Sequence, residues 1–167
     1  MSENKTIDIL KEAILLEHKG KALYKSVANQ SENREAKELF EMLVTEEEKH
    51  VEILMKQLKL VAEGKDFDAS GLDDIAPTTV DAVLSGKVIN GINAAGYEAA
   101  VVSAALEFEK NAVAYYGKQE ADAKSDDEKK LFNWLVKWEK EHMTMLAKID
   151  NEIKESVWYD NNFWPLD

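Results

Sequence analysis

Residues 39–50 read LFEMLVTEEEKH, and residues 131–142 read LFNWLVKWEKEH. The second stretch lies 92 positions after the first, since 131 − 39 = 92. Both end in Glu-x-x-His, a spacing that places the carboxylate and the imidazole on one side of a helix, about one turn apart. The leucines of both stretches recur at intervals typical of a helix with one buried face. These two blocks therefore predict a pair of related amphipathic helices.

The similarity between the two blocks extends over most of each half of the chain. Aligning residues 11–58 with residues 103–150 without gaps gives 13 identities in 48 positions. About three would be expected by chance at typical residue frequencies. The chain is therefore an internal repeat, and we expect two helix pairs related by a pseudo-twofold axis.

Four segments have apolar residues at spacings of three and four. The predicted helices cover about residues 4–29, 32–62, 94–123 and 125–155. Ser31 is the predicted N-cap of the second helix, and Gly64 is predicted to end it. Ser125 and Glu128 form a predicted capping box at the start of the fourth helix.

A long connection separates the two helix pairs. Residues 63–93 are rich in turn formers and are predicted to include a short helix at 79–85. This segment is too long for a tight turn, and it fits the single long crossover of a ferritin-like four-helix bundle. We predict one all-α domain over residues 1–167, with repeat halves at about 4–62 and 94–155, the crossover at 63–93 and an aromatic tail at 156–167. The tail is expected to pack on the bundle or on a partner subunit.

Composition restricts the classes of function. The formal net charge is −12 and the chain contains no cysteine. A nucleic-acid partner requires a basic surface, so the charge argues against one. The absence of cysteine excludes disulfides, thiolate metal sites and a built-in iron–sulfur relay. No apolar stretch approaches about twenty residues, and MSENKTIDILKE lacks a signal-peptide core, so we expect a cytoplasmic protein with no membrane partner.

Six ionisable side chains interrupt the apolar faces of the four predicted helices. They are Glu17, Glu47, His50, Glu109, Glu139 and His142. Carboxylates in an apolar core are very unfavourable unless they are paired or bound to metal, and four together would repel one another. Two divalent cations would balance the four carboxylates and leave both imidazoles neutral. Oxygen and imidazole ligands suit iron or manganese better than structural zinc, so we predict two metal ions. Iron is expected because it is the usual occupant of di-metal carboxylate sites in ferritin-like bundles, and manganese or a mixed pair is the alternative.

A single Glu-x-x-His on an acidic helix is weak evidence for metal, because most such pairs face solvent. Here the motif occurs twice at one offset, and Glu17 and Glu109 are separated by the same offset. A repeat that preserved packing alone would have no reason to preserve glutamate and histidine within apolar faces. Glu98, three turns before Glu109, is a candidate auxiliary ligand, an entry-path carboxylate or a solvated side chain.

Tyr24 and Tyr116 lie seven residues after Glu17 and Glu109, two turns along the same helix faces. We name both as candidate catalytic residues, acting as hydrogen-bond donors to the ligands or as a radical and electron relay. The alternative is core packing with a satisfied hydroxyl. His18 points about 100° away from Glu17 and is expected at the surface. The four tryptophans are expected to serve packing.

Together these features resemble the rubrerythrin branch of the ferritin-like superfamily, over nearly the whole chain. The motifs that carry the resemblance are Glu17…Tyr24, Glu47-x-x-His50, Glu109…Tyr116 and Glu139-x-x-His142. It implies that Glu47 and Glu139 bridge two irons. The glutamates of the first and third helices would be terminal carboxylates, and each histidine would cap one ion. Such proteins often form homodimers, sometimes by exchanging helices, and both arrangements are expected alternatives here.

Two departures from the family pattern matter for function. Rubrerythrins typically carry a rubredoxin-like domain with four cysteines, whereas this chain has none, so an external donor such as a rubredoxin-type protein would supply electrons. They also usually have a further carboxylate three residues after the helix-3 glutamate, linked to metal rearrangement during peroxide reduction. Here that position is Ala112.

The resemblance implies an oxidoreductase that reduces hydrogen peroxide or dioxygen, as a defence against oxidative stress. Two alternatives stay open from the residues alone. One is a ferroxidase or iron-handling protein. The other is a structural metal-binding bundle without turnover.

Overall fold

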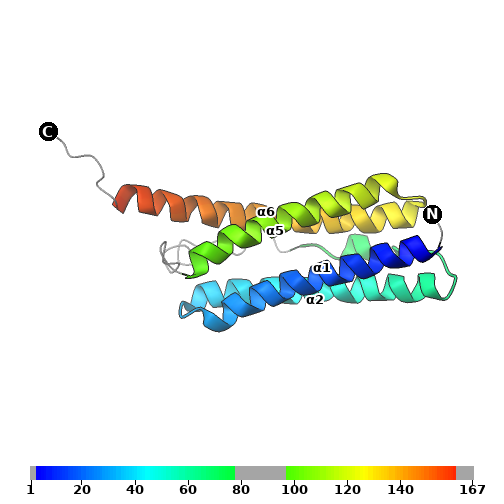
Figure 1. Cartoon of the computed structure of the whole chain (residues 1–167), viewed down its shortest axis with the longest axis horizontal. Coiled ribbons are helices and arrows are strands. Elements are labelled where there is room, and N and C mark those ends of the chain that lie inside the picture. Colours follow the sequence, from blue (N-terminus) through cyan, green and yellow to red (C-terminus); the bar gives the residue numbers. More distant parts are fainter. Residues whose placement is uncertain (1–2, 78–96, 161–167) are drawn as a thin grey trace.

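The computed structural model describes residues 3–77 and 97–160 of the chain (Figure 1). The elements are α1 (Glu3–Gln30), α2 (Arg34–Ala62), the short 3-10 helix η1 (Leu72–Asp74), α5 (Tyr97–Asp122) and α6 (Asp126–Asp160). No strand occurs within those two ranges. The prediction of an all-α, ferritin-like four-helix bundle is confirmed. The short helix predicted at 79–85 lies outside the described residues, as do the last residues of the predicted tail.

Local hydrogen bonds set the ends of α2. The Ser31 N–H donates to the carbonyl of Val27 at 2.9 Å, so Ser31 still belongs to the end of α1. The N-cap is instead Asn33, whose side chain accepts from the Ala36 N–H at 2.7 Å. The prediction of Ser31 as the cap was therefore wrong by two residues. At the other end, Gly64 adopts a φ of 72°, which a residue with a side chain rarely does, and α2 ends there as predicted.

One half of the capping box predicted for α6 is present. The Ser125 hydroxyl accepts from the Glu128 N–H at 3.1 Å, which satisfies a backbone donor that a helix start leaves without a partner. The Glu128 carboxylate accepts from the Lys124 N–H at 2.8 Å, one residue before the cap, and not from the Ser125 N–H that a capping box uses. Helix α6 continues to Asp160, beyond the predicted end near residue 155.

The helices pack as two pairs, α1 with α2 and α5 with α6, stacked as two layers (Figure 1). Helix α5 begins at the opposite end of the bundle from the end of α2, so a long crossover joins the pairs. The first part of this connection is tied to the helices by hydrogen bonds. The Gln57 side chain bonds both backbone polar groups of Asp68, at 2.8 and 2.9 Å, and the Trp134 indole donates to the Ile75 carbonyl at 3.2 Å.

The core consists of two apolar clusters, one toward each end of the bundle. The first includes Val27, Leu43, Val102 and Leu146, and the second includes Leu10, Leu54, Ala112 and Leu135. Along each helix, the predicted metal ligands lie between the stretches that contribute to these clusters. The predicted metal ligands therefore form a polar layer enclosed by apolar packing on both sides.

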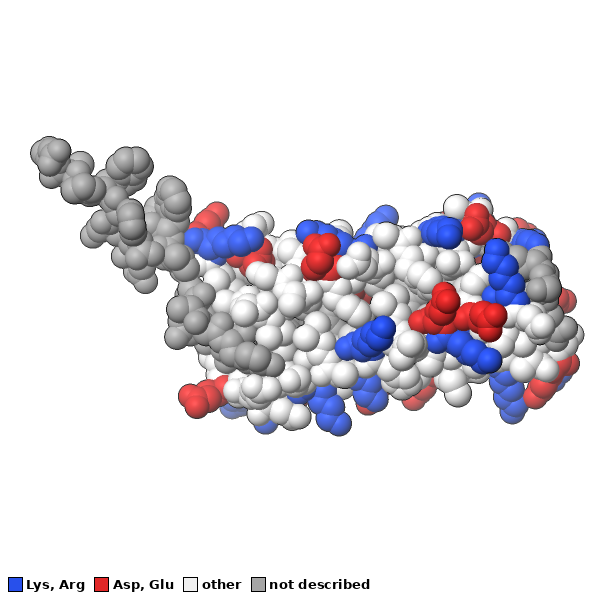
Figure 2. Space-filling view, viewed as in Figure 1, with Lys and Arg blue, Asp and Glu red and all other residues white. Residues whose placement is uncertain are grey.

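The surface of the bundle carries both signs of charge. On the face shown in Figure 2, acidic and basic side chains are interspersed rather than separated into large single-sign areas. Within the described ranges, no helix has a stretch both long and apolar enough to cross a membrane.

Candidate metal centre

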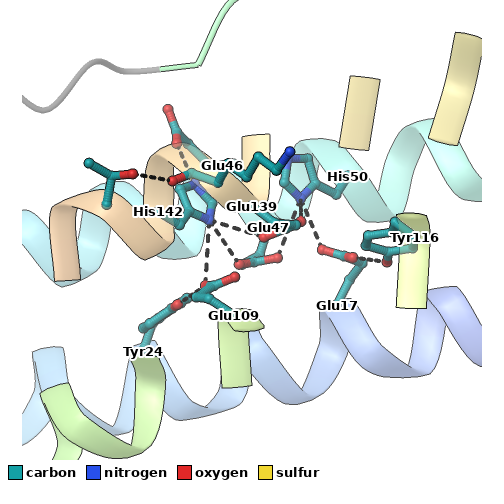
Figure 3. Close-up of polar contacts among 11 residues, drawn as sticks. Glu17, Tyr24, Glu46, Glu47, His50, Glu109, Tyr116, Glu139 and His142 are labelled. Atoms are coloured by element: carbon teal, nitrogen blue, oxygen red, sulfur yellow. Dashed lines mark hydrogen bonds and ion pairs between the residues drawn. The ribbon is translucent and has the colours of Figure 1, made fainter. Parts of the chain in front are cut away.

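The structure brings all six predicted ligand side chains together in the middle of the bundle (Figure 3). Each helix supplies one glutamate, and α2 and α6 each add a histidine one turn later. All six are at most 2% exposed. They fall into two overlapping groups, each of which could hold one metal ion, and within each group one ligand atom per residue lies within 4.8 Å of the others.

The first group is centred on His50. Its Nδ1 lies 2.9 Å from Glu17 Oε2, 3.1 Å from Glu139 Oε1 and 3.5 Å from Glu47 Oε2. Ligand atoms about 3 Å apart are expected around an ion bound by oxygen and nitrogen at about 2.1 Å. Helices α1, α2 and α6 contribute to this group, and α5 does not.

The second group is centred on His142. Its Nδ1 lies 3.3 Å from Glu139 Oε2 and 3.6 Å from both Glu47 Oε1 and Glu109 Oε1. Glu47 and Glu139 belong to both groups, whereas the other carboxylates belong to one each. The two imidazole rings face each other, with centroids 5.9 Å apart and planes inclined by 25°. The arrangement matches the predicted pattern of two shared and two terminal carboxylates, while metal ligation by these residues stays a proposal.

The pKa values of the four carboxyl groups of the metal-free site shift in two directions. Burial, reinforced by the charge of Glu139, raises the pKa of Glu17 and of Glu109 well above the ordinary value. Burial also favours the neutral form of Glu47 and Glu139, but nearby hydrogen-bond donors favour the charged form more strongly. For Glu139 the main opposing influence is the charged imidazole of His50, and its pKa falls below the ordinary value, as does that of Glu47.

The surroundings of both imidazoles favour their protonated form in this metal-free arrangement. Burial alone would lower the pKa of each histidine, but the carboxylates around them raise it well above the ordinary value. For His50 the strongest of these influences are the charges of Glu139 and Glu17, and for His142 they are the close polar contacts with Glu109, Glu139 and Glu46. Among the six candidate ligands, two imidazolium ions would thus balance two carboxylates.

Unpartnered polar atoms at the centre fit bound metal. Among the described residues, buried atoms without a hydrogen-bond partner include Glu47 Oε1, Glu109 Oε2, Glu139 Oε1 and His142 Nδ1. Buried polar atoms in proteins are nearly always satisfied, so such a concentration requires an explanation. Two divalent cations would use these atoms as ligands. The donor set of carboxylate oxygen and imidazole nitrogen suits iron or manganese.

The two tyrosines hold the terminal carboxylates reciprocally across the halves. The Tyr24 hydroxyl donates to Glu109 Oε1, and the Tyr116 hydroxyl donates to Glu17 Oε1. Burial and the neighbouring carboxylates raise the pKa of both phenols well above the ordinary value, so they stay neutral donors. Their positions combine the two interpretations made from sequence, because each tyrosine is buried in the core and its hydroxyl contacts a candidate ligand. A part in catalysis stays a prediction.

Sequence reasoning missed Glu46. This side chain is 2% exposed, and its Oε2 lies 2.7 Å from Nε2 of His142. The signal was present in the repeat, because the counterpart of Glu46 is Trp138 (46 + 92 = 138). A position that holds a large apolar residue in one half is expected to be buried in the other.

The remaining sequence predictions have different outcomes. His18 is exposed, as expected. Trp134 and Trp138 are buried beside His50, which agrees with a packing role. The side chain of Glu98 lies outside the described part of the structure.

A family model described as Rubrerythrin matches residues 8–150, which is 143 of the 167 residues (150 − 8 + 1 = 143). The chain belongs to the rubrerythrin family. Rubrerythrins typically bind iron, and the buried glutamate and histidine groups of this rubrerythrin domain are compatible with a di-iron site. Comparison with curated proteins and with solved structures gives no significant match.

Proposed function

We propose that this rubrerythrin is a di-iron oxidoreductase that reduces hydrogen peroxide, or dioxygen, with electrons from an external donor. The observation that carries the proposal is the pair of overlapping groups that share Glu47 and Glu139. Peroxide reduction consumes two electrons and two protons and yields two molecules of water. A ferrous pair held by these residues would supply the two electrons, and a one-electron donor such as a rubredoxin-type protein would replace them in two steps.

The ligand residues would hold the two ions in one neutral, buried site. Glu47 and Glu139 would lie between the ions, Glu17 and His50 would complete one position, and Glu109 would join the second histidine at the other. Four carboxylates balance the charge of two divalent cations.

The tyrosines would orient the terminal carboxylates and retain protons close to the ions. Each phenol keeps its proton, because burial and neighbouring carboxylates disfavour the phenolate. Each hydroxyl donates to one oxygen of a terminal carboxylate and leaves the other oxygen for metal. A reaction that consumes two protons in a buried site benefits from donors already placed there.

The apolar clusters on both sides of the polar layer would exclude bulk water from the reaction. Phe40 and Phe132 contribute to this enclosure, because their rings stack on Tyr24 and Tyr116 with centroids 6.1 and 6.3 Å apart. The same packing limits the movement of each tyrosine hydroxyl relative to its carboxylate.

The first test is iron loading under anaerobic conditions, followed by stoichiometric oxidant. We expect about two ferrous ions per chain and ferric absorbance that develops faster with peroxide than with air. Catalytic peroxide consumption should then follow when a rubredoxin-type donor is added. Failure to bind iron stoichiometrically, or ferrous protein that does not respond to peroxide, would contradict the proposal.

Ferrous-iron oxidation is the second candidate function, and Ala112 favours it. This residue is 1% exposed within the apolar cluster, at the position where rubrerythrins usually carry a further carboxylate linked to peroxide reduction. Under this alternative, air would be the better oxidant and each chain would turn over many ferrous ions. A chain that oxidises only its own two irons would count against iron handling.

A further inference from the structure

The outer nitrogens of the two histidines have different surroundings. In both rings Nδ1 faces the centre of the site and Nε2 points away from it (Figure 3). Nε2 of His142 bonds to Glu46, whereas Nε2 of His50 has no hydrogen-bond partner among the described residues. The His50 ring is bordered instead by Trp138 and Trp134, edge-on, with ring centroids 5.0 and 5.4 Å away.

This difference breaks the pseudo-twofold symmetry directly behind the two histidines. Glu46 on α2 contacts His142 on α6, and its counterpart Trp138 on α6 contacts His50 on α2. The geometry of the two contacts is thus reciprocal, while their chemistry is not. The six candidate ligands themselves are identical in the two halves.

A carboxylate on the outer nitrogen strengthens a histidine as a metal ligand. It fixes the tautomer that leaves the lone pair of Nδ1 directed at the metal, and it increases the basicity of that nitrogen. Removing such a partner typically lowers metal affinity roughly 10- to 100-fold. An indole edge offers the Nε2–H of His50 no comparable acceptor.

We infer that Glu46 is a positioning residue that makes the His142 position the tighter of the two metal positions, so that the ions bind in a defined order. The inference rests on the metal centre of the proposed function but not on its redox reaction. It also assigns the ion beside His50 as the one that exchanges more readily with solution.

The test uses chains that retain one histidine each, so that the two positions are measured separately. Anaerobic calorimetric titration with Fe²⁺ is performed on His50→Ala and on His142→Ala, each with and without Glu46→Gln. We expect Glu46→Gln to lower the affinity of the His50→Ala chain roughly 10- to 100-fold. In the His142→Ala chain the same change should alter affinity by no more than about twofold. Glu52→Gln removes the same charge from an exposed position of α2 and should affect neither chain.

The outcomes separate this inference from the proposed function. Equal losses in both backgrounds would show that Glu46 acts on the fold as a whole, and no loss in either would also overturn the inference. Two Fe²⁺ sites unaffected by Glu46→Gln would leave the proposed function standing, whereas an unsubstituted chain that binds no Fe²⁺ would remove both. If a single-histidine chain does not fold, Co²⁺ titration of the chain with both histidines replaces it. If the unsubstituted chain binds Co²⁺ in two separate steps and Glu46→Gln merges them into one, the inference is supported. If the binding steps are the same with and without Glu46→Gln, the inference is refuted.

Discussion

The His50 and His142 positions of the candidate metal centre have the same kinds of candidate ligand, but different side chains lie behind the two histidines. Each combines one histidine, one terminal glutamate and the two shared glutamates. Behind the histidine, one position has the indole of Trp138 and the other has the carboxylate of Glu46. The two halves of the repeat therefore have identical residues where side chains would contact metal, and different residues in contact with the far side of each histidine. Two positions with equivalent ligands can thus differ in affinity.

Removing a shared glutamate should have a much larger effect than removing a terminal one. We expect Glu139→Ala to abolish binding at both positions, because its two oxygens face different histidines, at 3.1 and 3.3 Å. Glu17→Ala should remove only the ion beside His50 and leave about one ion per chain. Metal analysis after anaerobic loading and desalting distinguishes these results. Exposed Glu107 provides the control, and unchanged metal content in Glu139→Ala would contradict the assignment.

Proton release should accompany metal binding at both positions. The raised pKa values of Glu17, Glu109, His50 and His142 mean that all four groups carry protons near neutral pH. Two ions must displace about four protons, so affinity should rise steeply with pH. Calorimetry in buffers of different ionisation enthalpy counts the protons. A count near zero would show that the charge distribution derived for the metal-free cluster is wrong.

The same pKa shifts predict how the stability of the metal-free chain depends on pH. Because both histidines have folded-state pKa values above the ordinary 6.5, their contribution to stability is complete below 6.5 and is lost as pH rises through the raised values. Denaturation midpoints of the metal-free chain should therefore fall as pH increases above about 6.5. Metal-loaded protein, whose imidazoles are neutral, should lack this decrease.

Symmetric substitution of the two tyrosines tests how far the equivalence of the halves extends. Tyr24→Phe and Tyr116→Phe each remove a buried donor to a terminal carboxylate. We expect each to lower the free energy of unfolding by about 1–3 kcal/mol, by similar amounts. Urea denaturation of the metal-free chains measures this. Tyr115→Phe is the control, because Tyr115 is half-buried and its hydroxyl donates to the Ile9 carbonyl. It should lower the free energy of unfolding by about 1 kcal/mol. Clearly unequal values for Tyr24 and Tyr116 would limit the symmetry to the inner ligands.

Two glycines provide the smallest test. A Cβ at Gly20 would lie 2.8 Å from the Phe108 ring and 3.4 Å from the Glu47 carboxylate, whereas one at Gly117 would meet nothing within 4 Å. Gly117→Ala should stabilise the chain by up to about 1 kcal/mol through helix propensity. Gly20→Ala should instead destabilise it by about 1–3 kcal/mol, because the ring must move. Thermal unfolding compares the two, and a stabilising Gly20→Ala would contradict the close approach.

The fold and the clustering of the six candidate ligands could be predicted because the same motifs occur in both halves of the sequence. Periodicity placed Glu17 and Glu109 within apolar faces, and the common offset linked them to the two Glu-x-x-His motifs. Physical chemistry then required a partner for buried carboxylates. The packed structure agrees with each of these steps.

The outer layer could not be predicted in the same way. The repeat offset does not say which helix faces which, so it could not reveal that Tyr24 bonds the glutamate of the opposite half. The counterpart of Glu46 in the repeat, Trp138, indicates a buried position, but the contact of Glu46 with His142 depends on the approach of α6. The cap of α2 depended on the last hydrogen bond of α1, which is decided by competition between neighbouring backbone groups. These features require the tertiary arrangement.

Neither helix pair contains a complete metal position. The pair α1–α2 supplies Glu17, Glu47 and His50, but the group around His50 also includes Glu139 from the other pair. The pair α5–α6 supplies Glu109, Glu139 and His142, but the group around His142 also includes Glu47 from the pair α1–α2. Bound ions would therefore act as cross-links between the halves, and metal concentration would control how firmly they are held together. Chelation should loosen the contact between the pairs before it unwinds either one.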